Sequence, residues 1–310
     1  MKLEIPKSIR WGISLALIAL LIYLADPLEL LARVQSLSLG VLGMLFAMLV
    51  IQLFILCVVY WRVIRVFSDI PFRAFATRYI MGWSTEFFLP GKLGAFSIAY
   101  LLRQEKIPLG VGVAMVVFVK FMTLALMLGI IAVAFPTQLG GQLDIYTTLA
   151  LVVLALVGVA VVFFTSIGRS MVRRLVARLG GEKFTGFGHA IARLWKSPRV
   201  IVKTTAGLLL SMVVGAAILS AVYASFGYDV SLLQLLAILS LSLLAGAIPI
   251  SLNGLGVKEG ITVFLLSQVG VPVSLGLVIS AVNSGIGLLM GLLVGVALAH
   301  ALPKMVLQET

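Results

Sequence analysis

Apolar stretches of about 20 residues recur along the whole chain, and this is the length of helix that crosses the hydrocarbon core of a bilayer. Only 11% of the 310 residues are charged, whereas a soluble domain usually carries about 25%. Because backbone groups within hydrocarbon need partners inside the protein, the spans are expected to be helices. We therefore predict an all-α, polytopic membrane helical bundle, with about seven or eight spans in one transmembrane domain that comprises residues 1–310. The expected spans are Trp11–Ala25, Leu39–Tyr60, Val111–Ala134, Thr147–Thr165, Thr205–Phe226, Leu232–Ile250 and Ser274–Ala299.

The distribution of basic residues predicts the orientation. Lys and Arg gather before the first span and within 61–79 and 166–204, whereas acidic residues outnumber them in the turns 26–38, 135–146 and 227–231. Positive residues collect on the cytoplasmic side of membrane proteins. We therefore expect the N-terminus, the basic connections and the C-terminus to be cytoplasmic. This pattern explains the net charge of +12 by topology, so no nucleic-acid partner is expected.

The stretch 80–102 is interrupted by "TEFFLPGKLGAF". If it crossed the membrane completely, the basic connection 166–204 would lie outside, against the distribution that membrane proteins follow. A re-entrant hairpin that enters from the cytoplasm and returns, with "LPGKLG" at its tip, keeps every basic loop inside. The ten residues Ile80–Leu89 would rise about 15 Å as helix, which is half of the core. The alternative is one continuous helix kinked at Pro90.

A second apolar run is broken by "PISLNGLGVKEG" at 249–260. Leu232–Ile250 is long enough to cross the core, whereas Gly260–Val271 would rise only about 18 Å as helix. The pair contributes an even number of passes in either arrangement, so the charge distribution leaves its depth open. If it is a hairpin, it enters from outside and approaches the first hairpin from the opposite face, as in transporters built from inverted repeats.

The basic connection 166–204 contains apolar residues at helical spacing, among them Phe187, Ile191, Leu194 and Trp195. Two interpretations fit this pattern. The connection forms amphipathic helices on the cytoplasmic membrane surface among anionic lipids, or it is a solvated basic loop that only fixes the topology.

The chain offers little for hydrolysis or group transfer. Its two histidines, His189 and His300, have no partner at metal-ligand spacing. No P-loop, H-E-x-x-H or G-x-S-x-G motif occurs in the sequence. We therefore expect that the protein is not an enzyme and that it has no catalytic residue, no metal site and no cofactor.

Polar residues within the apolar segments are the candidates for function. A charge at the centre of a bilayer helix costs about 2.5–3.5 kcal/mol on insertion scales, so it should face a protein interior or a wet cavity. Glycines permit sharp turns, and the start of a half-helix presents free N–H groups at its positive end. Together with a lysine, such an end favours an anionic group such as phosphate. The predicted substrate-binding residues are Glu86, Lys92, Gly94, Lys120, Asn253, Gly256, Lys258 and Glu259.

Two of these assignments have structural alternatives. The second interruption is also explained by a reverse turn between helices, with Lys258 and Glu259 facing the cytoplasm. Lys120 is also explained by a structural ion pair with Glu86 or Glu259.

In the last span Gly287, Gly291 and Gly295 are spaced by four residues. Small residues at this spacing permit close packing of helices. The row can pack within the monomer, or it can form the seam of a homo-oligomer.

The strings "FFLPGKLGAFSIAYLL" and "IPISLNGLGVKEG" resemble those of a flippase-like membrane family related to the transmembrane region of lysylphosphatidylglycerol synthases, over residues 40–299. The later motif is matched at Pro249, Gly254, Leu255, Gly256 and Glu259, and the earlier one at 90–94. Members often continue the earlier motif with an acidic residue and an Arg, where this chain has Ala95 and Ile98. Lys120 stands at the basic position of the next span. The resemblance implies an inner-membrane protein that moves lipids or lipid-linked intermediates between leaflets.

Three functions fit these features. The first is a lipid flippase-like transporter, in which Lys92 and Lys258 hold the anionic head group of a membrane lipid. In this hypothesis Glu86 and Glu259 orient the lysines or exchange protons. The second is a secondary transporter of a small solute or ion, which broken helices also suit. The third is a non-transporting membrane partner of a lipid-modifying enzyme, which acts through the basic surface of 166–204.

Overall fold

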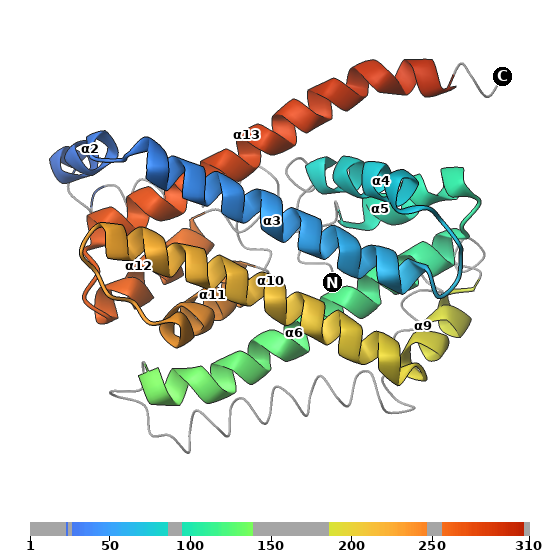
Figure 1. The fold of residues 1–310 in the computed structure, drawn as a ribbon, viewed down its shortest axis with the longest axis horizontal. Helices are drawn as coiled ribbons and strands as arrows, with labels where there is room; N and C mark the ends of the chain where they lie inside the picture. The colour runs from blue at the N-terminus through green and yellow to red at the C-terminus, as the bar shows by residue number, and fades with distance from the viewer. Residues whose placement is uncertain (1–22, 24–26, 86–94, 139–185, 247–255, 307–310) are drawn as a thin grey trace, which may run out of the picture. The chain divides into compact units, whose positions relative to one another are not determined.

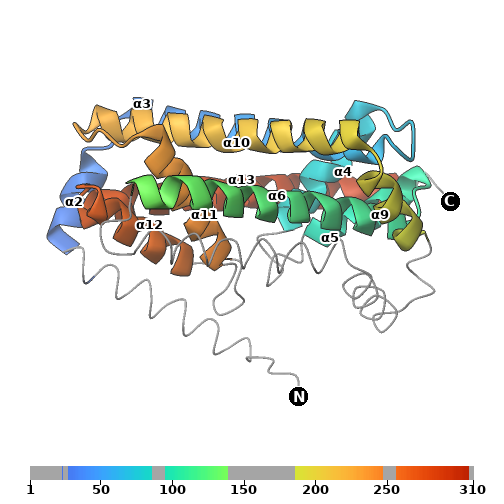
Figure 2. The same ribbon diagram turned by 90° about the horizontal axis from the view of Figure 1, so that it is seen from below.

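The computed structural model describes residues 23, 27–85, 95–138, 186–246 and 256–306, and the only regular structure of these residues is helical. Their arrangement is shown in Figures 1 and 2. The predicted all-α fold class is confirmed. In chain order the elements are α2 (Pro27–Gln35), α3 (Leu39–Ile64), α4 (Phe72–Thr85), α5 (Ala95–Leu101), the 3-10 helix η2 (Leu102–Glu105), α6 (Leu109–Gln138), α9 (Phe187–Trp195), α10 (Pro198–Ser225), α11 (Leu232–Gly246), α12 (Val257–Gln268) and α13 (Val273–Val306).

Four of the described helices are long enough and apolar enough to cross a membrane. These spans are Leu39–Ile64, Leu109–Ala134, Pro198–Ser225 and Val273–Gly295. Each overlaps a span predicted from the sequence, so the polytopic membrane architecture is confirmed. The predicted spans Trp11–Ala25, apart from Tyr23, and Thr147–Thr165 lie outside the described residues.

Helix α10 begins at Pro198, earlier than the predicted start at Thr205. Proline suits the first position of a helix, because its missing N–H would have no intrahelical acceptor there. Two N–H groups of the following turn bond to the carbonyl of Ser197 at 3.0 and 3.2 Å. Arg199 and Lys203 therefore belong to the helix, although their charge placed them in the connection by sequence alone.

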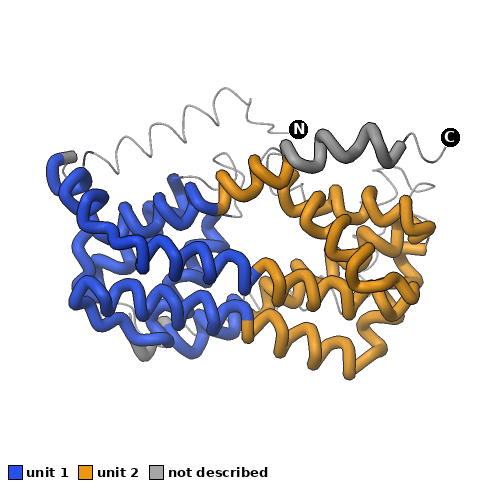
Figure 3. Tube along the Cα trace, turned by 45° about the horizontal axis from the view of Figure 1, so that its top comes forward, with its two compact units in different colours: residues 1–52, 127–153, 211–286 blue, residues 53–126, 154–210, 287–310 orange. Residues whose placement is uncertain are grey.

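The chain divides into two compact units, which Figure 3 colours separately. Unit 1 comprises residues 1–52, 127–153 and 211–286, and unit 2 comprises residues 53–126, 154–210 and 287–310. Helices α3, α6, α10 and α13 each contribute residues to both units.

Each unit has its own apolar core. In unit 1, helices α3, α10, α11, α12 and α13 all supply deeply buried residues, among them Leu45, Tyr223, Leu235, Leu266 and Leu275. In unit 2, helices α3, α4, α5, α6 and α9 supply Ile64, Phe75, Ala99, Phe118 and Leu194, which are fully buried. The broken helices are therefore packed into the protein as firmly as the long spans.

Helices α3 and α10 run antiparallel and close together in each unit (Figure 1). In unit 1 the side-chain amide of Gln52 donates a hydrogen bond of 3.1 Å to the carbonyl of Ser211. In unit 2 a Cβ placed on Gly207 would lie only 2.5 Å from Cγ2 of Val59. The absence of a side chain at Gly207 therefore permits the close approach of the two helices.

The chain turns back between α4 and α5. The hydroxyls of Thr85 and Ser97 are hydrogen-bonded at 2.9 Å. In one continuous helix these two residues would lie about 18 Å apart, at 1.5 Å per residue. The interpretation of 80–102 as a kinked continuous helix is therefore wrong, and the stretch forms a hairpin. The tip of this hairpin, 86–94, lies outside the described residues.

The first arm of this hairpin is longer than predicted, because α4 begins at Phe72 rather than near Ile80. An ion pair of 3.2 Å joins Arg78, in the middle of α4, to Glu105 at the end of η2; these side chains are 12% and 26% exposed. Two polar contacts thus hold the two arms of the hairpin together, one between Thr85 and Ser97 and one between Arg78 and Glu105.

Helix α9 differs from both expectations for the basic connection. The ring of Trp195 lies edge-on to Phe118 and Phe121 of α6, with centroid distances of 5.2 and 5.1 Å. Phe187 and Leu194 are buried in the core of unit 2. The apolar side of α9 is therefore covered by protein rather than by lipid or water, while residues 166–185 lie outside the described part of the chain.

Candidate functional site

The second interruption also belongs to a hairpin, formed by α11 and α12 (Figure 2). The hydroxyls of Ser242 on α11 and Thr262 on α12 are hydrogen-bonded at 2.9 Å. The described part of α11 has 15 residues, which rise about 22 Å as helix. The last four residues of the predicted span Leu232–Ile250 lie outside the described part of the chain.

Gly256 marks the entry into α12. Its φ of 84° lies in the left-handed region, which glycine adopts without steric cost. Its N–H donates a hydrogen bond of 2.8 Å to Oε2 of Glu259, three residues further on. A carboxylate in this position satisfies a backbone donor that the helix cannot, and its negative charge is stabilised by the positive end of the helix.

The carboxylate of Glu259 has a second partner. It is only 6% exposed, and its Oε1 accepts a hydrogen bond of 2.9 Å from the hydroxyl of Ser284 on α13. Each carboxylate oxygen is thus bonded to a different donor, one on the turn and one on the neighbouring helix. The reverse-turn alternative expected Glu259 to face the cytoplasm, whereas its side chain is buried in the protein. The depth of the turn in the membrane and the side that Lys258 faces stay predictions.

Lys258 lies on the same first turn of α12 and is half-buried. Its carbonyl accepts a hydrogen bond of 2.8 Å from the hydroxyl of Thr262, which fixes the backbone of this turn. The first N–H groups of a helix have no internal acceptor, and Lys258 is the second residue of α12, so it belongs to the positive end of this helix. We call Gly256, Lys258 and Glu259 the α12 elbow.

The structure brings together three of the predicted site residues, those of the α12 elbow. Lys120 lies on α6 in unit 2, where it is exposed although its neighbours Val119 and Phe121 are buried. The remaining predicted site residues lie outside the described part of the chain, namely Glu86, Lys92, Gly94 and Asn253. Substrate binding by all of these residues stays a prediction.

The three glycines spaced by four residues in the last span are covered to different degrees within a single chain. Gly287 and Gly291 are buried and Gly295 is half-buried. This burial favours close packing inside the monomer. A homo-oligomer through the same three residues stays a prediction.

Two hydroxyl residues that complete the elbow were not predicted as site residues, Thr262 and Ser284. A hydroxyl in an apolar helix needs a hydrogen-bond partner, and this requirement is the signal that points to them. Ser284 is separated from Glu259 by 25 positions, so the spacing of the residues cannot pair them without the packing of α12 against α13.

The chain was compared with curated proteins and with models of protein families. No curated protein matches the chain. The family model described as the lysylphosphatidylglycerol synthase TM region matches residues 11–295, a range that includes both hairpins and all four membrane-crossing helices of the described structure. The chain therefore belongs to the family of the lysylphosphatidylglycerol synthase transmembrane region.

Proposed function

We propose that this protein is a lipid flippase-like transporter, which moves an anionic lipid or a lipid-linked intermediate between the leaflets of the cell inner membrane. Membership of a family named for the membrane region of a lipid synthase supports a role in lipid handling. The observation that carries the proposal is the α12 elbow, where the half-buried cation of Lys258 follows a glycine turn and precedes the buried carboxylate of Glu259.

The contacts of the α12 elbow indicate different roles for its two charged residues, Glu259 and Lys258. Both oxygens of Glu259 are bonded to Gly256 and Ser284, so Glu259 positions the turn. No carboxylate among the described residues lies within ion-pair distance of Lys258. The Lys258 ammonium, together with the positive end of α12, therefore offers a site for an anionic oxygen of a lipid head group. In the proposal Lys92 supplies a second cation.

The acyl or prenyl chains of the lipid stay in the bilayer throughout this process. Leu289 and Leu293 on α13 are 58% and 62% exposed, so the helix that holds Ser284 also presents apolar side chains outward. We place both termini in the cytoplasm, with the first hairpin re-entering from the cytoplasm and the second from outside. Transport of this kind needs no catalytic residue, metal or cofactor.

Exchange of a fluorescent phosphatidylglycerol between leaflets of reconstituted vesicles tests the proposal. We expect the wild-type protein to accelerate exchange over protein-free vesicles. Lys258→Gln should lower the rate about tenfold, because it removes the charge that binds the head group. Lys258→Arg should retain most of the rate, since it keeps the charge.

Lys196→Gln is the matched control, because Lys196 is an exposed lysine at the end of α9 and should leave the rate unchanged. A wild-type rate equal to that of empty vesicles contradicts the transport function. A wild-type rate in Lys258→Gln contradicts the role of the α12 elbow while leaving transport itself intact.

A further inference from the structure

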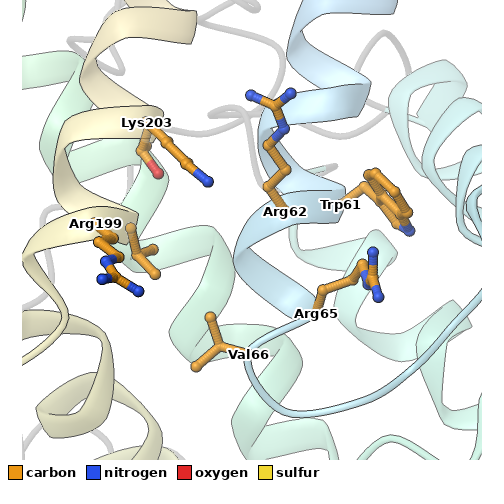
Figure 4. A pocket seen from close by; sticks show the side chains of 8 residues that line it. Trp61, Arg62, Arg65, Val66, Arg199 and Lys203 are labelled. Atoms are coloured by element: carbon orange, nitrogen blue, oxygen red, sulfur yellow. The ribbon is translucent and has the colours of Figure 1, made fainter.

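A pocket lies between α3 and α10 in unit 2 (Figure 4), whereas the α12 elbow belongs to unit 1. Its volume is about 360 Å³, and ligand sites in proteins have volumes of about 300–1,000 Å³. Its walls include four cationic side chains. We call it the basic pocket, and it is lined by Trp61, Arg62, Arg65, Val66, Arg199, Val200, Lys203 and Thr204.

The spacing of the cations explains how two helices build this pocket. Arg62 lies in the last turn of α3, and Arg65 follows the end of this helix, with its N–H still bonded to the carbonyl of Trp61 at 3.0 Å. Arg199 and Lys203 are four residues apart on α10, so they share one face of that helix. Lys203 extends from α10 toward α3 (Figure 4). The antiparallel packing of the two helices brings the end of α3 beside the start of α10, and the four cationic residues line the pocket there.

No carboxylate among the described residues lies within ion-pair distance of these four cations. One wall of the pocket is nevertheless well ordered. The indole N–H of Trp61 donates a hydrogen bond of 3.1 Å to the carbonyl of Ile70, and the guanidinium of Arg65 lies 5.1 Å above the Trp61 ring. The pocket therefore has four positive charges without a carboxylate partner among the described residues, on a wall that is fixed by the contacts of Trp61, and these charges favour the binding of an anion.

The position of the pocket identifies the kind of anion. Both walls are ends of membrane-crossing helices, and Trp61 is typical of residues at the boundary between hydrocarbon and water. Further along α10 from the pocket, the side chains of Leu209 and Leu210 are 40% and 53% exposed. Guanidinium groups match the geometry of phosphate oxygens, and basic pockets between membrane helices bind anionic lipid head groups.

We propose that the basic pocket binds the phosphate-bearing head group of an anionic membrane lipid, with the acyl chains lying along α3 and α10. This site is distinct from the α12 elbow, and the inference does not depend on the proposed transport function. Arg62 and Lys203 face the phosphate from opposite walls, while Arg65 is oriented by Trp61.

Native mass spectrometry of the purified protein tests this assignment by counting bound lipid during titration with phosphatidylglycerol or phosphatidylcholine. We expect the wild type to prefer phosphatidylglycerol. The double variant Arg62→Gln, Lys203→Gln should lose about tenfold in affinity for phosphatidylglycerol, because two cations near a membrane surface are removed. The charge-conserving variant Arg62→Lys, Lys203→Arg should retain most of the affinity.

The matched control is Arg73→Gln, Lys196→Gln, which removes the same charge from exposed positions outside the pocket. It should change the affinity less than about twofold, since isolated exposed charges contribute little. Equal binding of the two lipids by the wild type, or equal losses in both double variants, would overturn the proposal.

A further titration with inorganic phosphate distinguishes a lipid from a soluble ligand. Weak competition that displaces phosphatidylglycerol only at high phosphate concentration supports the lipid site. Tight binding of inorganic phosphate, lost in the pocket variant while phosphatidylglycerol binding is unchanged, would assign the pocket to a soluble anion and overturn the lipid assignment.

Discussion

The hydroxyl of Ser284 on α13 donates a hydrogen bond of 2.9 Å to the buried carboxylate of Glu259 on α12. The second oxygen of the same carboxylate accepts the N–H of Gly256 at 2.8 Å. One acidic side chain thus joins the turn of a hairpin to the helix beside it. The buried carboxylate has a hydrogen-bond donor for each of its oxygens. If the carboxylate were removed, the N–H of Gly256 and the hydroxyl of Ser284 would both lose their acceptor.

Glu259→Ala should lower the free energy of unfolding by about 3 kcal/mol, because it leaves two donors without an acceptor. Glu259→Gln should cost less, since one amide oxygen can still accept one of the two hydrogen bonds. Ser284→Ala should cost about 1 kcal/mol. Titration with sodium dodecyl sulfate in mixed micelles, followed by tryptophan fluorescence, measures these losses. The control is Ser267→Ala on α12, the helix of Glu259, which should change the free energy of unfolding by less than about 0.5 kcal/mol. A loss in this control as large as that of Glu259→Ala would contradict the specific role of Glu259.

Gly256→Ala should destabilise the protein by about 1–2 kcal/mol, because alanine is disfavoured at the positive φ of this position. The hydrogen bond to Glu259 requires this backbone conformation, so lipid exchange should fall as well. Gly43→Ala is the control, because a Cβ at Gly43 meets nothing within 4 Å. It should be neutral or slightly stabilising through helix propensity. Wild-type stability in Gly256→Ala would show that the turn tolerates another conformation.

Gly112→Ala should separate α5 from α6. A Cβ on Gly112 would lie 2.8 Å from the backbone Cα of Ala99, which cannot move as a flexible side chain would. We expect a loss of about 1–3 kcal/mol in the free energy of unfolding, as for other overpacked sites. Gly129→Ala lies on the same helix and its Cβ meets nothing within 4 Å, so it should cost nothing. Similar melting temperatures for the two variants would disprove the close contact.

Paired cysteines test both hairpins directly. Thr85→Cys with Ser97→Cys, and Ser242→Cys with Thr262→Cys, should form intramolecular disulfides on mild oxidation, because the native hydroxyls are 2.9 Å apart in each pair. A maleimide polymer labels free thiols and slows the protein on a gel, so a bridged pair is recognised because its mobility stays unchanged.

The control for this experiment pairs Thr77→Cys with Ser97→Cys. Thr77 lies two turns below Thr85 on α4, about 12 Å along the helix, so this pair should remain reduced. Bridging at equal rates in the control and the test pair would contradict the hairpin register.

The long spans of this chain were predictable because an apolar run of sufficient length has few alternatives. The predicted spans beginning at Leu39, Val111 and Ser274 start within two residues of α3, α6 and α13. The hairpin over 80–102 was also predictable, since the distribution of Lys and Arg required the chain to return. These predictions depended on the hydrophobicity of a run of residues and on the number of basic residues, and both are sums over the sequence.

The contacts that build the sites were not predictable in this way. The pairing of Glu259 with Ser284, and of Arg62 with Lys203 across one pocket, depends on which helix faces meet. Arg199 and Lys203 were counted only as orientation signals, although their spacing of four residues placed them on one face. The spacing of the cations was available in the sequence, but the identity of the opposing helix was not.

Trp195 sits against two rings of α6, those of Phe118 and Phe121. Only Lys196 and Ser197 separate this tryptophan from the first residue of α10. These contacts fix the end of α9 against α6, and with it the place where the positively charged start of α10 begins. The aromatic contact at Trp195 thus connects the position of helix α6 to the position of the positive charges at the start of helix α10.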